Sequence, residues 1–320
     1  MKKYLKDLET ELKNNNLSDE EIEEIIADHE EMIESAIKEG LSDEELEAKF
    51  GDPKAVAEEL ADFSEKAEEK TEDEEVKEGK KIEFSEVSDE YNVEISLINE
   101  DFKVRLHEKD SIVVELVGRI KVDRYDIGFK DNTFYLRRKK GIEIRSYFER
   151  NAKKEFIIYL PKSKSILRFR LKVVNGDGVI NNISTSDFVV GTNNGDIKIK
   201  EIETKGLSIN TINGDLVLDQ INCDNFKLSL ISGDIKAMNV KIKNDLNCNT
   251  VSGDMALINV ECDNVNLRTV SGDVVGNEFY PNTISLVSVS GDVKIMNTKK
   301  TDINFKKKKS VSGDIRIHIK

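Results

Sequence analysis

Apolar and polar residues alternate along the C-terminal half of the chain, in segments that recur around a repeated Gly-Asp pair. Eight such pairs begin at Gly176 and end at Asp314, with spacings of 19, 19, 19, 20, 19, 19 and 22 residues. Apolar residues stand seven and five positions before the first seven glycines, where the position three before is mostly Thr, and apolar residues recur two and four positions after most of the glycines. This period of two predicts strands with one buried face on both sides of each pair.

A single repeat of this length cannot bury its own apolar face. Stacked repeats can, because each coil pairs its backbone with the next coil about 4.8 Å away. The sequence therefore predicts a mostly β fold, a parallel β-helix or solenoid with coils of about 19 residues over residues 82–320. We expect degenerate coils in 82–170 and regular Gly-Asp coils in 171–320.

The repeated pair marks a tight corner. Glycine adopts a positive φ without a Cβ penalty, and the preceding Asn or Ser and the following Asp can bond nearby backbone N–H groups. The predicted turn glycines are Gly195, Gly214, Gly233, Gly253, Gly272, Gly291 and Gly313. A metal ladder is the alternative interpretation of the aspartates, namely Asp196, Asp215, Asp234, Asp254, Asp273 and Asp292.

Residues 1–63 follow a helical period instead and predict a small all-α domain. Leu5, Leu8 and Leu12 share one helix face, and capping boxes begin at residues 18 and 42. His29 falls on an apolar face and is expected to be a satisfied core histidine. Asp52-Pro53 is expected to open the last helix. Residues 64–81 are a charged linker or a frayed extension of that helix.

Charge is distributed unevenly along the chain. Residues 1–63 hold 21 Asp and Glu against 7 Lys and Arg, a net charge of −14, whereas residues 103–172 hold 9 against 20, a net charge of +11. This imbalance predicts that the acidic domain docks on the basic segment, in the same chain or a neighbouring one; two independently solvated faces are the alternative. No recognition module surrounds the basic residues, so no nucleic acid partner is expected.

Little in the sequence suggests catalysis. The three histidines are scattered, and no cluster of Cys and His has metal-ligand spacing. We expect no enzyme activity, no cofactor and no dedicated metal centre. The three cysteines, Cys223, Cys248 and Cys262, are expected to be reduced. Without an apolar run long enough for a membrane span or a signal peptide, the expected compartment is the cytoplasm. Cell-surface exposure through non-classical export is the alternative.

Two family resemblances follow from these motifs. The segments "TVSGDM", "TVSGDV" and "SVSGDV", with the upstream "FIIYLPKS", resemble the bacterial DUF4097 family, which often carries an adhesin label. The N-terminal segment, ending in "FGDPKAVAEEL", resembles the helical HAAS (DUF1700) domain. These resemblances imply a bacterial signalling or scaffolding role near envelope-stress or regulatory systems, without catalytic residues.

The sequence thus indicates a non-enzymatic interaction or scaffold protein with protein partners. A surface adhesin or envelope sensor is the alternative, and a polysaccharide-active β-helix is a remote one. The last repeat contains Lys306, Lys307, Lys308 and Lys309. We expect these lysines to deter edge-to-edge pairing of the terminal coil. The alternative is a basic contact for an anionic membrane or polymer.

Overall fold

The structure is a computed structural model, which describes residues 2–15, 22, 25, 26, 29, 33, 52–58, 80–118, 120–139, 154–299 and 303–319. The chain divides into two compact units, residues 1–78 and 79–320, which are described separately.

The first unit contains α1 (Lys2–Asn14), an amphipathic helix. Tyr4, Leu8 and Leu12 are buried at a spacing of four residues, which places them on one face. His29 is also buried, and its Nδ1 lies 2.8 Å from the carbonyl oxygen of Ile25. The expectation of a satisfied core histidine is therefore confirmed. Residues 53–58 are helical, as Asp52-Pro53 predicts, while both capping boxes and most of the charged linker lie outside the described residues.

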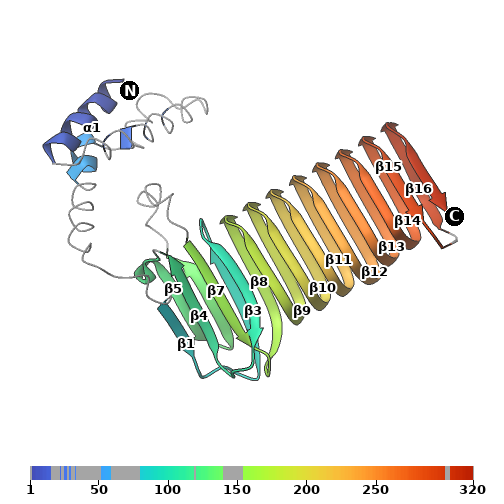
Figure 1. The fold of residues 1–320 in the computed structure, drawn as a ribbon, viewed down its shortest axis with the longest axis horizontal. Coiled ribbons are helices and arrows are strands. Elements are labelled where there is room, and N and C mark those ends of the chain that lie inside the picture. The colour runs from blue at the N-terminus through green and yellow to red at the C-terminus, as the bar shows by residue number, and fades with distance from the viewer. Residues whose placement is uncertain are drawn as a thin grey trace. The chain divides into compact units, whose positions relative to one another are not determined.

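The second unit is a β-solenoid preceded by a more irregular set of strands (Figure 1). The irregular part contains β1 (Lys80–Phe84), β2 (Glu90–Leu97), β3 (Asp101–His107), β4 (Ile112–Gly118), a short 3-10 helix (Val122–Arg124), β5 (Tyr125–Lys130), β6 (Thr133–Arg138) and β7 (Lys154–Pro161). The regular part contains β8 (Ser165–Asn175), β9 (Gly178–Asn194), β10 (Ile197–Asn213), β11 (Leu216–Ser232), β12 (Ile235–Ser252), β13 (Met255–Ser271), β14 (Val274–Ser290), β15 (Val293–Asn297), β16 (Asn304–Ser312) and β17 (Ile315–Ile319).

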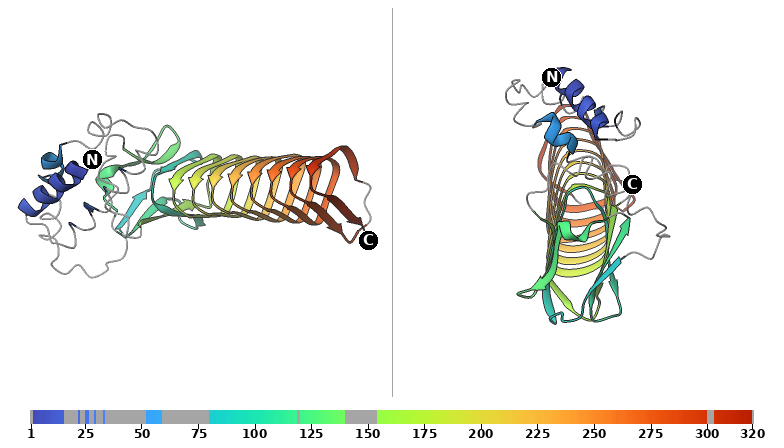
Figure 2. Two further views of the ribbon diagram at one scale, coloured as in Figure 1. Left: turned by 90° about the horizontal axis from the view of Figure 1, so that it is seen from above. Right: turned by 90° about the vertical axis from the view of Figure 1, so that its left-hand side faces the viewer.

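The regular coils stack in parallel, each in register with the next (Figure 2). Strands β9 to β14 each run through nearly a whole coil. They bend at a residue six positions after each Gly, where φ is positive although the residue is not glycine. These residues are Asn182, Glu201, Gln220, Asn239, Asn259 and Glu278, with φ of 53–59°. The sequence did not reveal this second corner, because only three of the six positions hold Asn, which favours a positive φ, and the other three hold Glu or Gln, which do not.

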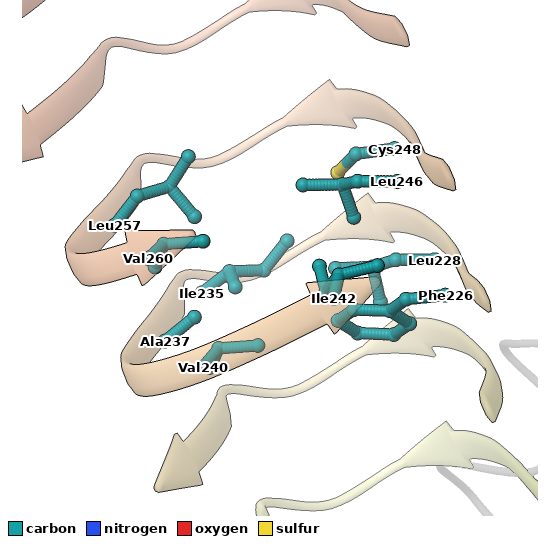
Figure 3. Close-up of a pocket in the computed structure, with 10 residues that line it drawn as sticks. All are labelled: Phe226, Leu228, Ile235, Ala237, Val240, Ile242, Leu246, Cys248, Leu257 and Val260. Atoms are coloured by element: carbon teal, nitrogen blue, oxygen red, sulfur yellow. The ribbon is translucent and has the colours of Figure 1, made fainter. Parts of the chain in front are cut away.

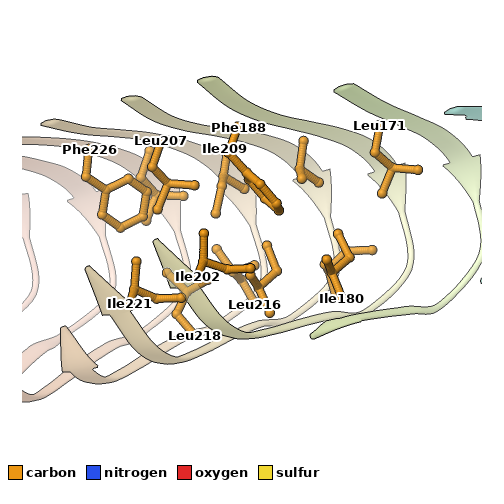
Figure 4. Close-up of a cluster of buried hydrophobic side chains, with 14 of the residues drawn as sticks. Leu171, Ile180, Phe188, Ile202, Leu207, Ile209, Leu216, Leu218, Ile221 and Phe226 are labelled. Carbon is orange, nitrogen blue, oxygen red and sulfur yellow. The ribbon is translucent and has the colours of Figure 1, made fainter. Parts of the chain in front are cut away.

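The core is a set of aliphatic columns with a few phenylalanines (Figure 4). Leu207 and Ile209 of β10 point into the coil from one side and Ile202 from the other, and the same positions recur in neighbouring coils. In one column the small side chain of Ala237 stands between the larger side chains of Leu218 and Leu257 in the neighbouring coils. A small apolar void lies beside this residue (Figure 3).

Residues 82–170 are only partly coils. Strands β2 and β3 form one coil that lies directly beside β8 and β9, and β6 and β7 add a further parallel layer beyond it. In contrast, β1 is antiparallel to β4, β4 to β7, and β5 to β6. The expectation of degenerate coils is therefore wrong for β1, β4 and β5. Alternation predicts a strand but not its direction, and this region has no Gly-Asp pair to impose a parallel return.

Candidate functional site

The Gly-Asp corner is built by close backbone contact between coils. The predicted turn glycines all have a φ between 118° and 123°. At Gly253 a Cβ would lie 1.9 Å from the carbonyl oxygen of Gly233 in the preceding coil. Glycine is needed here both for the positive φ and for the absence of a side chain. The conformation predicted for these glycines agrees with the structure.

The aspartates at successive corners form a continuous hydrogen-bonded column, which we call the Asp row; all but the first follow a glycine. Its members are Asp101, Asp177, Asp196, Asp215, Asp234, Asp254, Asp273, Asp292 and Asp314. In each step the backbone N–H of one aspartate donates to Oδ1 of the aspartate one coil earlier. The N···O distances lie between 2.8 and 3.0 Å. Repulsion between stacked carboxylates is thus offset by one charge-assisted hydrogen bond per coil.

The residues before the glycines form a second ladder in the first coils. The side-chain amides of Asn99, Asn175, Asn194 and Asn213 bond one to the next, at 2.8, 2.6 and 2.9 Å. From Ser232 onward the column consists of serines. The ladder shows that Asn99 occupies a corner equivalent to the later ones, although Glu100 replaces the glycine there.

Metal binding by the Asp row is a separate question. Among the described residues, no group of three or more Cys, His, Asp or Glu side chains is arranged to hold a metal ion. Each carboxylate from Asp101 to Asp292 already uses Oδ1 within the row, and the aspartates from Asp177 onward are exposed. Turn capping is therefore a role that the geometry shows, and the metal ladder stays an untested alternative.

Beside the corner runs a row of exposed aliphatic side chains, which we call the aliphatic row. Its members stand two positions before successive glycines: Val174, Ile212, Ile231, Val251, Val270, Val289 and Val311. Their exposed fractions lie between 39% and 50%, and Val311 reaches 72%. Only Asn193 interrupts the row. A contiguous apolar surface of this kind on a folded domain marks a binding site more often than scattered single residues do.

Sequence reasoning missed the aliphatic row, although its signal is present. The signal is the first letter of the repeated "VSGD", a residue that the buried columns do not require to be apolar. The position two before glycine lies on the outward side of that alternation. An outward position that is aliphatic in seven of eight repeats is unusual on a solvated strand, and this pattern could have identified the surface.

The outer surface next to the aliphatic row carries no acidic side chain. It consists of the outward positions four and six residues before each glycine, on β8 to β14 and β16, and we call it the acid-free face. Its charged residues are all basic: Arg170, Lys172, Lys227, Arg268, Lys307 and Lys309. The remaining positions hold Asn, Ser, Gly and Val. The aliphatic row therefore separates an acidic row from a sparsely basic face, in a chain whose net charge is −14.

The cysteines and histidines are not assembled into a reactive group. Cys223, Cys248 and Cys262 are free and buried, and burial raises the pKa of each thiol to about 12. His107 on β3 has its Nε2 2.6 Å from the carbonyl oxygen of Ser111, and His318 lies on β17. The thiols are thus protonated near neutral pH and shielded from solvent, which disfavours them as nucleophiles.

The four lysines lie on β16, which pairs with β14 and has no partner on its other edge within the described part of the chain. The register shifts between Ile284 and Ser285, so that Lys308 aligns with the buried Leu286. Its Nζ lies 6.0 Å from the ring centroid of Phe305. A lysine in a core column of an edge strand is a known means of discouraging further pairing. Whether these lysines guard the edge or bind an anionic surface stays a prediction.

In the described part of the chain, no helix is both long and apolar enough to cross a membrane. The expected docking of residues 1–63 on residues 103–172 also stays a prediction, because the two units are described independently.

Comparison with known proteins gives two family matches. Residues 3–59 match the HAAS family, and residues 90–319 match the family described as Toastrack DUF4097. No curated protein matches the chain. Solved structures with a similar fold include a putative adhesin from Bacteroides fragilis, with 17% identity, a TM-score of 0.48, and coverage of 76% of this chain and 98% of that one. A putative adhesin from Parabacteroides distasonis has 14% identity, a TM-score of 0.47, and coverage of 75% and 98%. The Toastrack DUF4097 match spans most of the chain, including every Gly-Asp coil, and this protein therefore belongs to that family.

Proposed function

We propose that this protein is a non-enzymatic scaffold that binds a macromolecular partner along the corner of its solenoid. The observation that carries the proposal is the aliphatic row, which is exposed over successive coils and flanked by surfaces of opposite charge character. A row of this kind suits an extended contact with another macromolecule, whereas a small substrate calls for a concave pocket with convergent polar groups. The inaccessible thiols also favour a role without catalysis.

The HAAS match at the N-terminus supports a regulatory setting, in which the helical domain receives or transmits a signal and the solenoid provides a rigid platform. The link to envelope-stress or regulatory signalling is part of the proposal. The adhesin description of the solved structures is the second candidate, and the acid-free face is a surface on which a polymer or cell wall component could rest. Cell fractionation, combined with protease treatment of intact cells, distinguishes a regulatory scaffold from a surface adhesin.

Site-specific photocrosslinking in cells tests the proposed binding surface. A photoreactive residue replaces Ile231 in the aliphatic row, and the matched control replaces Lys241, an outward residue of β12 on another side of the coil. We expect discrete crosslinked species from position 231 and none from position 241. Equal crosslinking from both positions, or none from position 231, would contradict the proposal.

A further inference from the structure

We propose that the partner seated on the aliphatic row is a second copy of this chain. The two solenoids lie side by side with their axes parallel, related by a two-fold axis that runs along the row. This inference rests on the proposed binding role of the row and specifies its occupant. Three properties of the described residues carry it: the spacing of the row, the charges on its two sides and its length.

The spacing of the row matches that of another stacked β-structure. Its side chains follow one another at the distance between coils, about 4.8 Å. An α-helix laid along the row would present one turn every ~5.4 Å, and an extended strand one side chain of a given face every ~6.6 Å. Both lose register within a few coils. A second aliphatic row has the same repeat and keeps contact along its whole length.

The charges select one relative orientation of the two copies. The Asp row lies on one side of the aliphatic row and the acid-free face on the other. If the two solenoid axes ran antiparallel, the Asp row of one copy would face the Asp row of its partner. If they run parallel, each Asp row faces the acid-free face of the other copy. Asp273 then lies at the level of Arg268 across the interface, and Asp314 at the level of Lys309.

The length of the row is sufficient for a specific contact. From Val174 to Val311 it crosses eight coils, or roughly 34 Å at about 4.8 Å per coil. Serine and asparagine side chains flank it and supply a polar rim. A two-fold contact is isologous, so one surface that complements itself serves both copies and closes the assembly at two chains.

Sedimentation of the purified full-length chain measures the association directly. We expect a dimer that weakens at least ~30-fold in the double variant Ile231→Lys, Val251→Lys, the loss typical of removing hot-spot contacts of about 2 kcal/mol. The matched control is Val275→Lys, a half-buried outward valine of β14 whose neighbour in register on β15 is Lys294. This control should dimerise like the wild type, and circular dichroism melts should show all variants folded.

A charge variant tests the orientation. Arg268→Glu places a carboxylate opposite the partner's Asp row, so we expect weaker dimerisation that recovers as salt is raised. In the antiparallel arrangement position 268 would not face the Asp row, and the substitution would have little effect.

Engineered cysteines give the sharpest test, because all three native cysteines are buried. Val174→Cys and Val289→Cys stand near opposite ends of the row. In the parallel arrangement each variant crosslinks to itself on mild oxidation, and each yields a covalent dimer alone. In an antiparallel arrangement neither does so alone, and only a mixture of the two variants crosslinks, which would overturn the proposed orientation.

If the purified chain stays monomeric at high micromolar concentration, the proposal that the partner is a second copy of this chain is wrong. Crosslinks from position 231 in cells to species of another mass would then leave the scaffold function standing with a different occupant. If position 231 also gives no crosslink in cells, both proposals fail. The two failures are therefore distinguishable.

Discussion

The regular coils and the N-terminal strands of the solenoid unit are held together by different kinds of contact. In β9 to β14 each coil repeats the contacts of the previous one, so that a single corner, a single Asp bond and a few core columns are used many times. In β1 to β7 each strand has its own partner and direction, and polar groups are buried in unique arrangements. Repetition makes stability additive over neighbouring coils, whereas the N-terminal strands depend on individual side chains.

Glu100 illustrates the second strategy. It stands where a corner glycine would be expected, and it is almost completely buried. Its Oε1 accepts from the Tyr125 hydroxyl at 2.6 Å and lies 3.5 Å from Nη1 of Arg138, while Oε2 accepts from the backbone N–H groups of residues 98 and 99. One carboxylate therefore ties the corner of the first coil to β5 and β6. In every later coil a glycine stands at the position equivalent to Glu100.

The largest expected effect concerns the repeated corner. Gly253→Val should lower the free energy of unfolding by more than ~3 kcal/mol, because the positive φ strains a β-branched residue and the Cβ meets the Gly233 carbonyl oxygen. Asp254→Ala removes one capping bond and should cost only about 1 kcal/mol. Denaturant melts of both variants measure the difference. A larger loss from Asp254→Ala would show that the Asp row, and not the glycine corner, dominates coil stability.

The next effect concerns the N-terminal strands. Glu100→Gln keeps the shape of the side chain but removes the charge, and it leaves Arg138 without its buried counter-ion. We expect a loss of about 1.5–3 kcal/mol, typical of hydrogen bonds to charged groups. Glu203→Gln, the same substitution at an exposed residue of β10, should change stability far less. Similar losses from the two substitutions would contradict the view that single buried groups control the N-terminal strands.

A smaller effect, a gain in stability, is expected from a substitution in the regular coils. Ala237→Val adds two methyl groups beside the apolar void of Figure 3, in a column that otherwise holds Leu218 and Leu257 at the neighbouring levels. The free energy of unfolding should rise by roughly 0.5–1.5 kcal/mol, the usual scale for one methylene group or two in a core. A loss of stability would mean that the neighbouring side chains already close the void.

The smallest expected effect is that of calcium. Because every carboxylate of the Asp row except the last already accepts a backbone hydrogen bond, millimolar Ca²⁺ should leave the thermal midpoint nearly unchanged. Differential scanning calorimetry with and without the ion, with Mg²⁺ as the ionic control, checks this expectation. A saturable rise of many degrees would revive the metal-ladder interpretation of the aspartates.

The contrast between the two regions also explains how much the sequence could predict. The regular coils were predictable because each column is sampled eight times, so that Gly253 or Leu267 is recognised from its equivalents. The direction of β4 and the partners of Glu100 occur once and depend on contacts between distant segments. The bend at Glu201 escaped because its positive φ is imposed by coil geometry and not by a turn-forming residue. The aliphatic row was predictable as well, because the buried columns already define which positions point outward, and seven of the eight outward residues two before glycine are Val or Ile.

The Asp row has a mechanical consequence. All its hydrogen bonds run in one direction, from the N–H of one coil to the carboxylate of the coil before it, and they lie across the gap between neighbouring coils. Tension that lifts the last coil away from the stack loads one such contact at a time and leaves the others relaxed. Each detached coil of 19 residues then releases roughly 65 Å of extended chain. Under load the solenoid would therefore unfold coil by coil, with similar increases in extended length, and not in a single rupture.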